Sequence, residues 1–238
     1  ARVAATIDNA RLYRRVERQN RTFRILTRLS QEFSSILDLD VLLNHIAAAI
    51  KSLIKYDAFS ILLLDRESES LRHRFSIRYD KCVDLDNIPL GKGITGAAAA
   101  TREVIRADDT LSDPRYLAFH PDVRSEVAVP LMVRDNVIGV MDLESSRPAY
   151  FTDDHVRMLS LLAPQIASSV ENARLYGEIA QREKRIAADL AAAHDLQLAL
   201  LPRKAPAVEG LEIAVGYKPA QAIGGDVYDF FEYSDASL

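Results

Sequence analysis

Two glycines stand directly before an acidic residue near the end of the sequence, at Gly224, Gly225 and Asp226. Paired glycines let the backbone approach a phosphate or a hydrated metal ion, because no side chain stands in the way. The carboxylate of Asp226 suits hard ions such as Mg²⁺ or Mn²⁺. Asp229 follows three residues later and would face the other side of a regular strand, so we interpret it as structural or secondary. The motif therefore points to chemistry on a phosphate or a metal ion.

The residues that precede this motif strengthen the interpretation. They are Leu196-Gln197, Leu200-Leu201-Pro202 and Gly210-Leu211-Glu212-Ile213, followed by Ala222 to Phe231. Together they resemble the opening of a SpoIIE-like serine/threonine phosphatase domain of the metal-dependent (PPM) class, over about the last fifth of the chain. The resemblance implies that Asp226 is a metal ligand. It also implies that two Mg²⁺ or Mn²⁺ ions in the intact parent enzyme hydrolyse phosphoserine or phosphothreonine on a partner, such as an anti-sigma-factor antagonist.

Residues 203–238 would hold only the truncated start of such a domain. We expect no complete catalytic site, no bound metal and no activity in this chain, because the other acidic ligands are missing. The alternation of apolar residues predicts a strand from Leu211 to Tyr217, and a second strand would carry Asp226 to Tyr233. Two strands alone are marginal in water, so we expect residues 203–238 to be poorly packed or to lean on the preceding helix. Gly-Gly-Asp also begins the signature of diguanylate cyclases, which is the less favoured alternative.

A second resemblance covers the middle of the chain, roughly residues 25–176. Its motifs occur in order as Gly91 to Gly96, Asp113 to Tyr116, Ser125 to Leu131, Val137 to Val140, Phe151-Thr152 and Glu171 to Tyr176. They resemble a GAF domain. The resemblance implies an α+β fold, in which an antiparallel sheet has helices on one side and a ligand pocket on the other. Family members bind cyclic nucleotides, haem, tetrapyrroles or small acids, and for some no ligand is known.

The ligand of this domain is not identified by the sequence. Loops commonly carry ligand contacts, so the candidate residues for the pocket rim are Arg106, Asp108, Asp109, Arg115 and Tyr116. The five histidines have no short metal-ligand spacing, and Cys82 has no neighbouring histidine that would favour a bilin. The residue signature of cyclic-nucleotide-binding members is absent. Gly91, Gly93 and Gly96 also match a dinucleotide-binding pattern, but the surrounding sequence does not predict the βαβ unit which that pattern needs.

Long helices are predicted on both sides of this domain. An N-terminal helix follows a heptad seam through Leu12, Val16, Gln19, Phe23, Leu26, Ser30, Phe33 and Leu37. The last helix has Thr152 or Asp153 as its N-cap and no breaker except Gly177 until Pro202. The apolar stripe of its second half is interrupted by Arg182, which predicts a weak or adjustable coiled coil. A homodimer through these helices is the simplest way to cover the stripe.

A repeat of five residues helps to set the domain boundaries. Asn9 to Tyr13 recurs as Asn172 to Tyr176, at a domain-sized offset. We therefore assign residues 1–24 to a helical linker that includes the tail of a preceding GAF domain. Residues 25–172 form the GAF domain, 173–202 the linker helix or coiled coil, and 203–238 the start of the phosphatase domain. The chain is expected to be part of a longer protein.

Composition narrows the function further. The net charge is −4, with 34 acidic and 30 basic residues, which gives no electrostatic footprint for nucleic acid or an anionic membrane. One cysteine excludes an internal disulfide framework, and no apolar run approaches a membrane span. We predict a cytoplasmic regulatory sensor that controls a phosphatase through a dimeric helical linker. The alternatives are a small-molecule-binding module or a dimerisation module, both without a catalytic role.

Overall fold

The computed structural model describes residues 27–78, 81–82, 87–117 and 121–231. Residues 27–34 are helical and lead into the first element that is complete. The elements are, in order, α2 (Leu39–Leu53), β1 (Ala58–Asp65), β2 (Ser70–Arg78), β3 (Lys81–Cys82), β4 (Ile88–Pro89), α3 (Gly93–Thr101), β5 (Ile105–Ala107), β6 (Ser125–Val133), β7 (Asn136–Ser145) and α4 (Asp153–Leu200). Contacts divide the chain into two units, Ala1–Gly177 and Glu178–Leu238.

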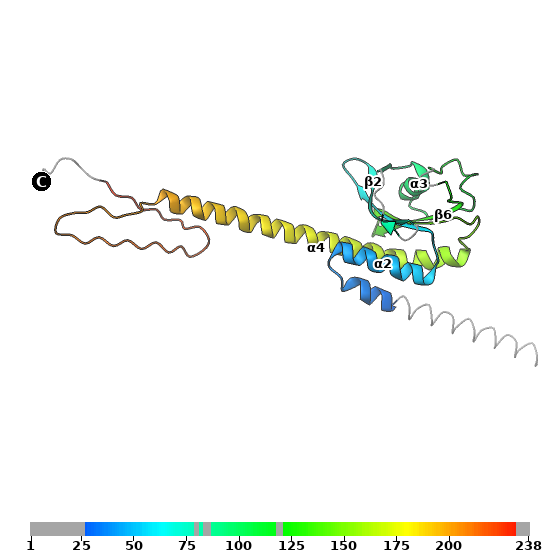
Figure 1. Cartoon of the computed structure of the whole chain (residues 1–238), viewed down its shortest axis with the longest axis horizontal. Coiled ribbons are helices and arrows are strands. Elements are labelled where there is room, and N and C mark those ends of the chain that lie inside the picture. Colours follow the sequence, from blue (N-terminus) through cyan, green and yellow to red (C-terminus); the bar gives the residue numbers. More distant parts are fainter. Residues whose placement is uncertain (1–26, 79–80, 83–86, 118–120, 232–238) are drawn as a thin grey trace, which may run out of the picture. The chain divides into compact units, whose positions relative to one another are not determined.

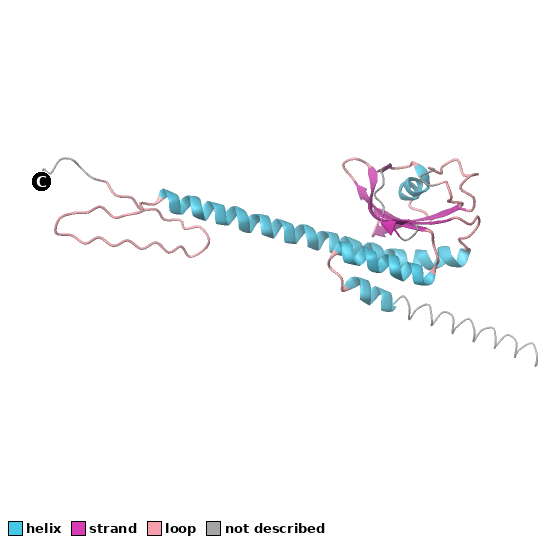
Figure 2. Ribbon diagram, viewed as in Figure 1, coloured by secondary structure: helices cyan, strands magenta, loops and turns pink. Residues whose placement is uncertain are grey.

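The strands form one antiparallel sheet in the order β3-β2-β1-β7-β6-β5, and β4 pairs with β2 (Figure 2). No two described strands run parallel, so the βαβ unit of a dinucleotide-binding fold is not present in this sheet. The α+β fold with an antiparallel sheet is thereby confirmed.

Helices lie on both faces of the sheet (Figure 1). The larger core is formed by the helical residues around Phe33, by α2, and by the first half of α4, all packed against Phe59 and its neighbours on the sheet. The smaller core lies under α3, where Ile94 and Ala98 contact the opposite face. The expectation of helices on one side therefore holds for α2 and α4, whereas α3 covers the pocket side. The short, alanine-rich sequence of α3 suits a cover that lies close to the strands.

Side-chain caps decide where the two long helices begin. The carboxylate of Asp38 accepts a hydrogen bond from the amide of Val41, at 2.9 Å, and α2 starts at the next residue. The hydroxyl of Thr152 accepts a bond from the amide of His155, and α4 starts at Asp153. Thr152 is thus the N-cap of α4, one of the two residues that the sequence predicted.

The apolar runs from Glu126 to Val133 and from Val137 to Leu143 predict a hairpin that turns at Asp135-Asn136, and the turn between β6 and β7 lies one residue earlier. Arg134 and Asp135 connect the strands, and Arg134 adopts a φ of 55°. In the middle of β7, Gly139 lies opposite Leu131 on one neighbour and Leu63 on the other. A Cβ at this glycine would overlap the carbonyl oxygen of Leu62. The close approach of β1 and β7 therefore requires glycine at this position.

The C-terminal region differs from its prediction. Within residues 203–231 the structure contains no strand, and only an isolated bridge joins Val208 and Leu211. The expected strands from Leu211 to Tyr217 and from Asp226 onward are wrong as far as these residues are described, because a two-stranded ribbon has no sheet on which to pack. This segment does lean on the end of α4, as expected: Gln197 bonds to Gly224, and the Tyr228 hydroxyl donates to the Pro202 carbonyl at 3.2 Å.

Two predictions concern the helices. The heptad seam before residue 27 and the first copy of the five-residue repeat lie outside the described residues. The coiled coil of α4 remains a prediction, although most of its residues after Ala173 are exposed.

No helix in the described part of the chain is long and apolar enough to cross a lipid bilayer.

The sheet geometry predicts a large effect of Gly139→Ala. The added methyl group must push β1 and β7 apart, so we expect a loss of about 1–3 kcal/mol in the free energy of unfolding, measured by urea titration. Gly177→Ala is the matched control, because Gly177 lies inside α4 with open space around it. It should leave stability unchanged or raise it by about 0.5–1 kcal/mol. Equal effects of the two substitutions would contradict the proposed strand contact.

Candidate functional site

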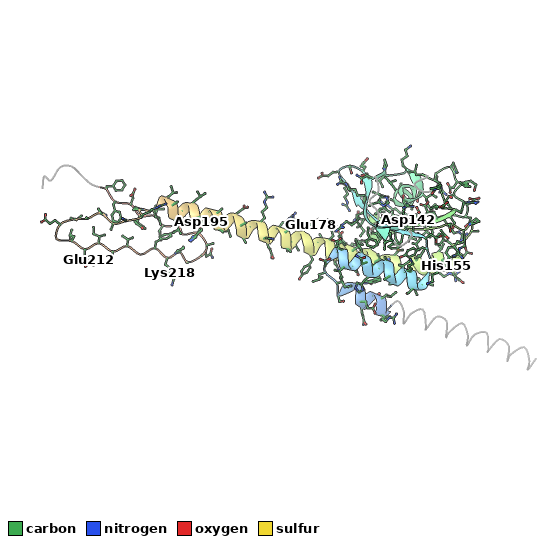
Figure 3. All side chains as sticks on the ribbon, in the orientation of Figure 1. Asp142, His155, Glu178, Asp195, Glu212 and Lys218 are labelled. Atoms are coloured by element: carbon green, nitrogen blue, oxygen red, sulfur yellow. The ribbon has the colours of Figure 1, made fainter. Side chains whose placement is uncertain are left out.

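Four charged side chains are buried in the sheet, on the side that α3 covers. Arg78, Glu126, Asp142 and Glu144 are 7%, 5%, 4% and 4% exposed. They come from the neighbouring strands β2, β6 and β7, and Asp142 lies among the side chains of the sheet in Figure 3. Charged groups are almost never this buried unless they are paired or used. We call these four residues the charged cluster.

Strand register explains why the cluster converges. Ala58 pairs with Arg78 on β2 and with Glu144 on β7, so the two long side chains meet across a methyl group. Glu126 pairs directly with Glu144. One row further along, Ser60 pairs with both Ser76 and Asp142. Because residues two apart share a face, Asp142 and Glu144 point to the same side of β7. Ala58 and Ser60 on the central strand β1 are small, so they leave space for the longer side chains of the cluster.

The only complete ion pair of the cluster joins Arg78 and Glu144. Nη1 of Arg78 donates to Oε2 of Glu144 at 2.7 Å, and Nη2 donates to Oε1 at 3.1 Å. This bidentate geometry is the strong form of an arginine–carboxylate contact. Two further buried atoms, Nε of Arg78 and Oδ1 of Asp142, have no hydrogen-bond partner among the described residues. Buried polar atoms without a partner in the protein indicate a site where a water molecule or a ligand completes the hydrogen bonds.

Glu126 and Asp142 form a hydrogen-bonded acid pair. Burial raises the pKa of Glu126 well above its usual value, and the nearby charges of Asp142 and Glu144 raise it further. Burial and the charge of Glu144 also raise the pKa of Asp142, whereas its bond with Glu126 opposes that rise. The hydrogen bond raises the pKa of Glu126 and lowers that of Asp142, so Glu126 is its donor and Asp142 its acceptor. The cluster thus places three buried carboxyl groups around one guanidinium.

A small cavity lies over the cluster. Its walls are the charged cluster, His73, Ile88, Leu117 and the first turn of α3, from Gly93 to Thr95. The centre of a water molecule can reach about 20 Å³ of it, which is room for one or two waters or a group of similar size. Gly93 has a φ of 68°, and a Cβ there would press on Leu117 at 3.0 Å. Glycine at the start of α3 therefore lets Leu117 pack against the helix and form this wall of the cavity.

A chain of hydroxyl groups lies behind the wall of the cavity. Nδ1 of His73 lies 2.9 Å from Oγ of Ser76, which donates to Oγ of Ser60 at 3.0 Å. Ser60 is the strand partner of Asp142. The two serines hold His73 from behind the cavity wall, and the wall itself offers carboxyl groups, which suit a ligand with a cationic or hydrogen-bond-donating group.

The residues predicted for the pocket rim are placed elsewhere or beside the cavity, and their role in ligand binding remains a prediction. Arg106 binds Asp108 at 3.0 Å and Asp153 at 2.6 Å, which ties β5 to the start of α4. Asp109 pairs with Arg124, and Arg115 pairs with Asp113. None of these four predicted residues lines the cavity.

Tyr116 is the predicted rim residue that lies nearest to the cluster. It packs against the smaller core. Burial raises the pKa of its hydroxyl, and the charges of Glu144 and Glu126 add to the effect. The cluster residues were missed as a site, although the sequence carries a signal for them. Acidic residues two apart in an apolar strand, as at Asp142 and Glu144, predict carboxylates on one face of a sheet.

The residues of the predicted metal motif are exposed or half-buried. Asp226 and Asp229 are exposed, and Asp229 bonds to the amide of Phe230. Gly225 is exposed as well, and Gly224 is held by Gln197. The described residues contain no group of three histidine, cysteine, aspartate or glutamate side chains that would hold a metal ion. The metal role of Asp226 remains a prediction.

Known proteins resemble this chain over the sheet domain. The structure of free methionine-R-sulfoxide reductase from Neisseria meningitidis, in complex with its substrate, has a TM-score of 0.58 and 25% identity. That match covers 65% of this chain and 90% of the other. The GAF domain of an Acinetobacter phosphoenolpyruvate-protein phosphotransferase also has a TM-score of 0.58, with 23% identity. This match covers 66% of this chain and 96% of that domain. The likeness to the phosphotransferase domain supports the fold alone.

Curated relatives match parts of the chain. Free methionine-R-sulfoxide reductase from Escherichia coli (strain K12) is 34% identical over 79 residues, which are 33% of this chain and 48% of the reductase. The formate hydrogenlyase transcriptional activator FhlA from the same organism is 26% identical over 196 residues, 78% of this chain and 28% of the activator. The chain thus spans about half or less of these relatives' lengths.

A family model agrees with the structure and with these likenesses. The model described as GAF domain matches residues 36–171, more than half of the chain, and this stretch contains the whole sheet, α2, α3 and the charged cluster. The chain belongs to the GAF domain family.

Proposed function

We propose that this GAF domain is a sensor that binds a small molecule with a cationic ammonium group over the charged cluster. The observation that carries the proposal is the excess of three buried carboxyl groups over one guanidinium, with Oδ1 of Asp142 facing no partner among the described residues. Buried carboxylates without full compensation cost free energy of folding. An ammonium group would supply three donors and a positive charge, and thereby remove that cost in the bound state.

The likeness to the reductases supports this ligand class. Their named substrate, free methionine-R-sulfoxide, is an amino acid and so carries an ammonium group. We propose binding without reduction for this chain. Thiol reduction of a sulfoxide leaves an oxidised thiol that a second thiol resolves as a disulfide. This chain has one cysteine, Cys82, and so it cannot form that disulfide within itself.

We also propose that α4 carries the signal to a SpoIIE-like phosphatase domain. What supports this is the motif at Gly224, Gly225 and Asp226, together with the motifs that precede it. In the parent enzyme, two Mg²⁺ or Mn²⁺ ions would supply the activated water for hydrolysis of a phosphoprotein. A homodimer through α4 would transmit the state of the GAF domain. The phosphatase and the dimer are both proposals, and the ligand proposal depends on neither.

The ligand class predicts a pair of binding results. We expect free methionine-R-sulfoxide, or another free amino acid from a panel of the common ones, to raise the melting temperature of the chain in a thermal-shift assay. Ligand at 100 times its Kd adds about 2.7 kcal/mol to stability. The N-acetyl form of the same compound lacks the charged ammonium and should bind at least about tenfold more weakly. Selective binding of neutral or anionic compounds would refute the proposed class.

Asp142→Asn is the matching test on the protein side. The substitution keeps the shape of the side chain and removes its charge, so we expect the Kd of the same ligand to rise by about tenfold to a hundredfold in calorimetry. Asp109→Asn is the control, because Asp109 pairs with Arg124 and does not line the cavity. It should leave the Kd unchanged. Equal losses in both variants would show that the cavity is not the binding site.

The acid pair also predicts how stability depends on pH. The pKa values of Glu126 and Asp142 are raised in the folded state, so folding favours their protonated forms. Their contribution is fully present below the ordinary carboxyl pKa of about 4 and is lost as the pH rises through the raised values. The free energy of unfolding should therefore fall as the pH rises above the ordinary carboxyl range.

The pH dependence has its own control. In the double variant Glu126→Gln with Asp142→Asn this decline should disappear. Asp57, Asp109 and Glu171 have lowered pKa values, and they act in the opposite direction at lower pH. Denaturant unfolding at each pH provides the measurement. A decline that persists in the double variant would place its origin outside the acid pair.

A further inference from the structure

The second half of α4 carries an apolar stripe that the fold leaves exposed. Ile179, Ile186 and Leu190 are 55%, 58% and 40% exposed. At 100° per residue, eighteen residues make five full turns, so Gln197 lies directly in line with Ile179 along the helix. Leu201, just after the helix, is eleven residues beyond Leu190, which is close to three turns. The stripe therefore continues into Gln197 and Leu201.

The far end of the stripe is covered by the chain itself. Nε2 of Gln197 donates to the carbonyl oxygen of Gly224 at 2.6 Å, and its Oε1 accepts from the Gly224 amide at 3.0 Å. Leu201 is only 7% exposed, in contrast to Ile186. One side chain thus satisfies both backbone groups of a single glycine. The C-terminal segment that contains residues 222–228 occupies the same face that is bare further up the helix.

The bare part of the stripe fits the same part of a second copy. In a parallel pair, Ile179, Ile186 and Leu190 each face their own counterpart. Arg182 and Glu183 lie about 60° and 40° from Ile179, on opposite sides of the stripe, so that in a parallel pair each arginine meets the glutamate of the other chain. An antiparallel pair centred on Ile186 would instead place Leu190 against Arg182. The charges therefore favour a parallel pair with one register.

We propose that α4 of a second copy binds along Ile179, Ile186 and Leu190, and that its extension toward Leu201 displaces residues 222–228 from Gln197. The proposal rests on the dimer that the proposed function includes, but not on the ligand. The Gln197 amide cannot hold Gly224 and also pack in the seam between two helices. Pairing of α4 would thus release the segment that carries Gly224, Gly225 and Asp226, whereas the unpaired chain holds it.

The test is Gln197→Leu in the whole chain, with Gln181→Leu as its control. Gln181 is exposed and lies about 160° around the helix from Ile179. In sedimentation equilibrium, Gln197→Leu should tighten the dimer by about tenfold, and Gln181→Leu should not change it. In hydrogen exchange, the Gly224 amide should exchange faster in Gln197→Leu than in Gln181→Leu. In the unsubstituted chain, exchange at Gly224 should become faster as protein concentration rises through the dimer Kd.

Ile186→Glu separates the two parts of the proposal. It places a charge in the stripe without touching Gln197, so it should abolish the dimer while circular dichroism shows a folded chain. Its Gly224 amide should stay protected at every protein concentration. If the chain is monomeric at millimolar concentration with and without Gln197→Leu, the pairing of α4 is wrong. If dimers form but the protection of Gly224 does not depend on concentration, pairing stands and the competition is wrong.

Discussion

The ion pair between Arg78 and Glu144 is the interaction on which the pocket depends. The pair brings two charged side chains into the sheet. Arg78 and Glu144 reach each other across Ala58, which is the strand partner of both. Removal of one partner from a buried pair costs about 3–5 kcal/mol, because the other charge is left uncompensated. Burial beside Glu144 raises the pKa values of both Glu126 and Asp142, and a hydrogen bond joins the two acids. The guanidinium thus sets how much negative charge the cavity can keep.

The opposite face of the sheet supplies the stability that such a site requires. There, Phe33, Phe59 and Phe151 are fully buried together with the apolar faces of α2 and α4. Each fully buried side chain of this size contributes about 1.5–3 kcal/mol from its removal from water. The strands therefore have an apolar side that holds them in register and a polar side that holds the cluster. Because β1 and β7 contribute to both sides, the register set by the large core also positions Asp142 and Glu144.

The sequence allowed the elements of the domain to be predicted better than the site. Apolar runs in the sequence predict strands from Ala58 to Leu64, Glu126 to Val133 and Val137 to Leu143, which correspond to β1, β6 and β7. Thr152 is one of the two residues that the sequence predicts as the cap of α4. The charged cluster needed strand neighbours that are far apart in sequence: Arg78 and Glu144 are separated by 66 residues. Periodicity places each of them on a face, but it does not say which strands are adjacent. The rim residues were chosen because loops commonly carry ligand contacts, and Arg106 instead pairs with Asp153.

The same limit explains Gln197. Taken alone, a glutamine in line with Ile179 is a polar defect in an apolar stripe, as Arg182 is. The structure gives the two defects different roles, because Gln197 bonds to a glycine 27 residues away, whereas Arg182 is exposed. A side chain amide matches one backbone donor and one backbone acceptor, so it suits contact with an irregular segment better than with another helix. The polar position thus marks where the stripe changes from a surface for a helix to a surface for a loop.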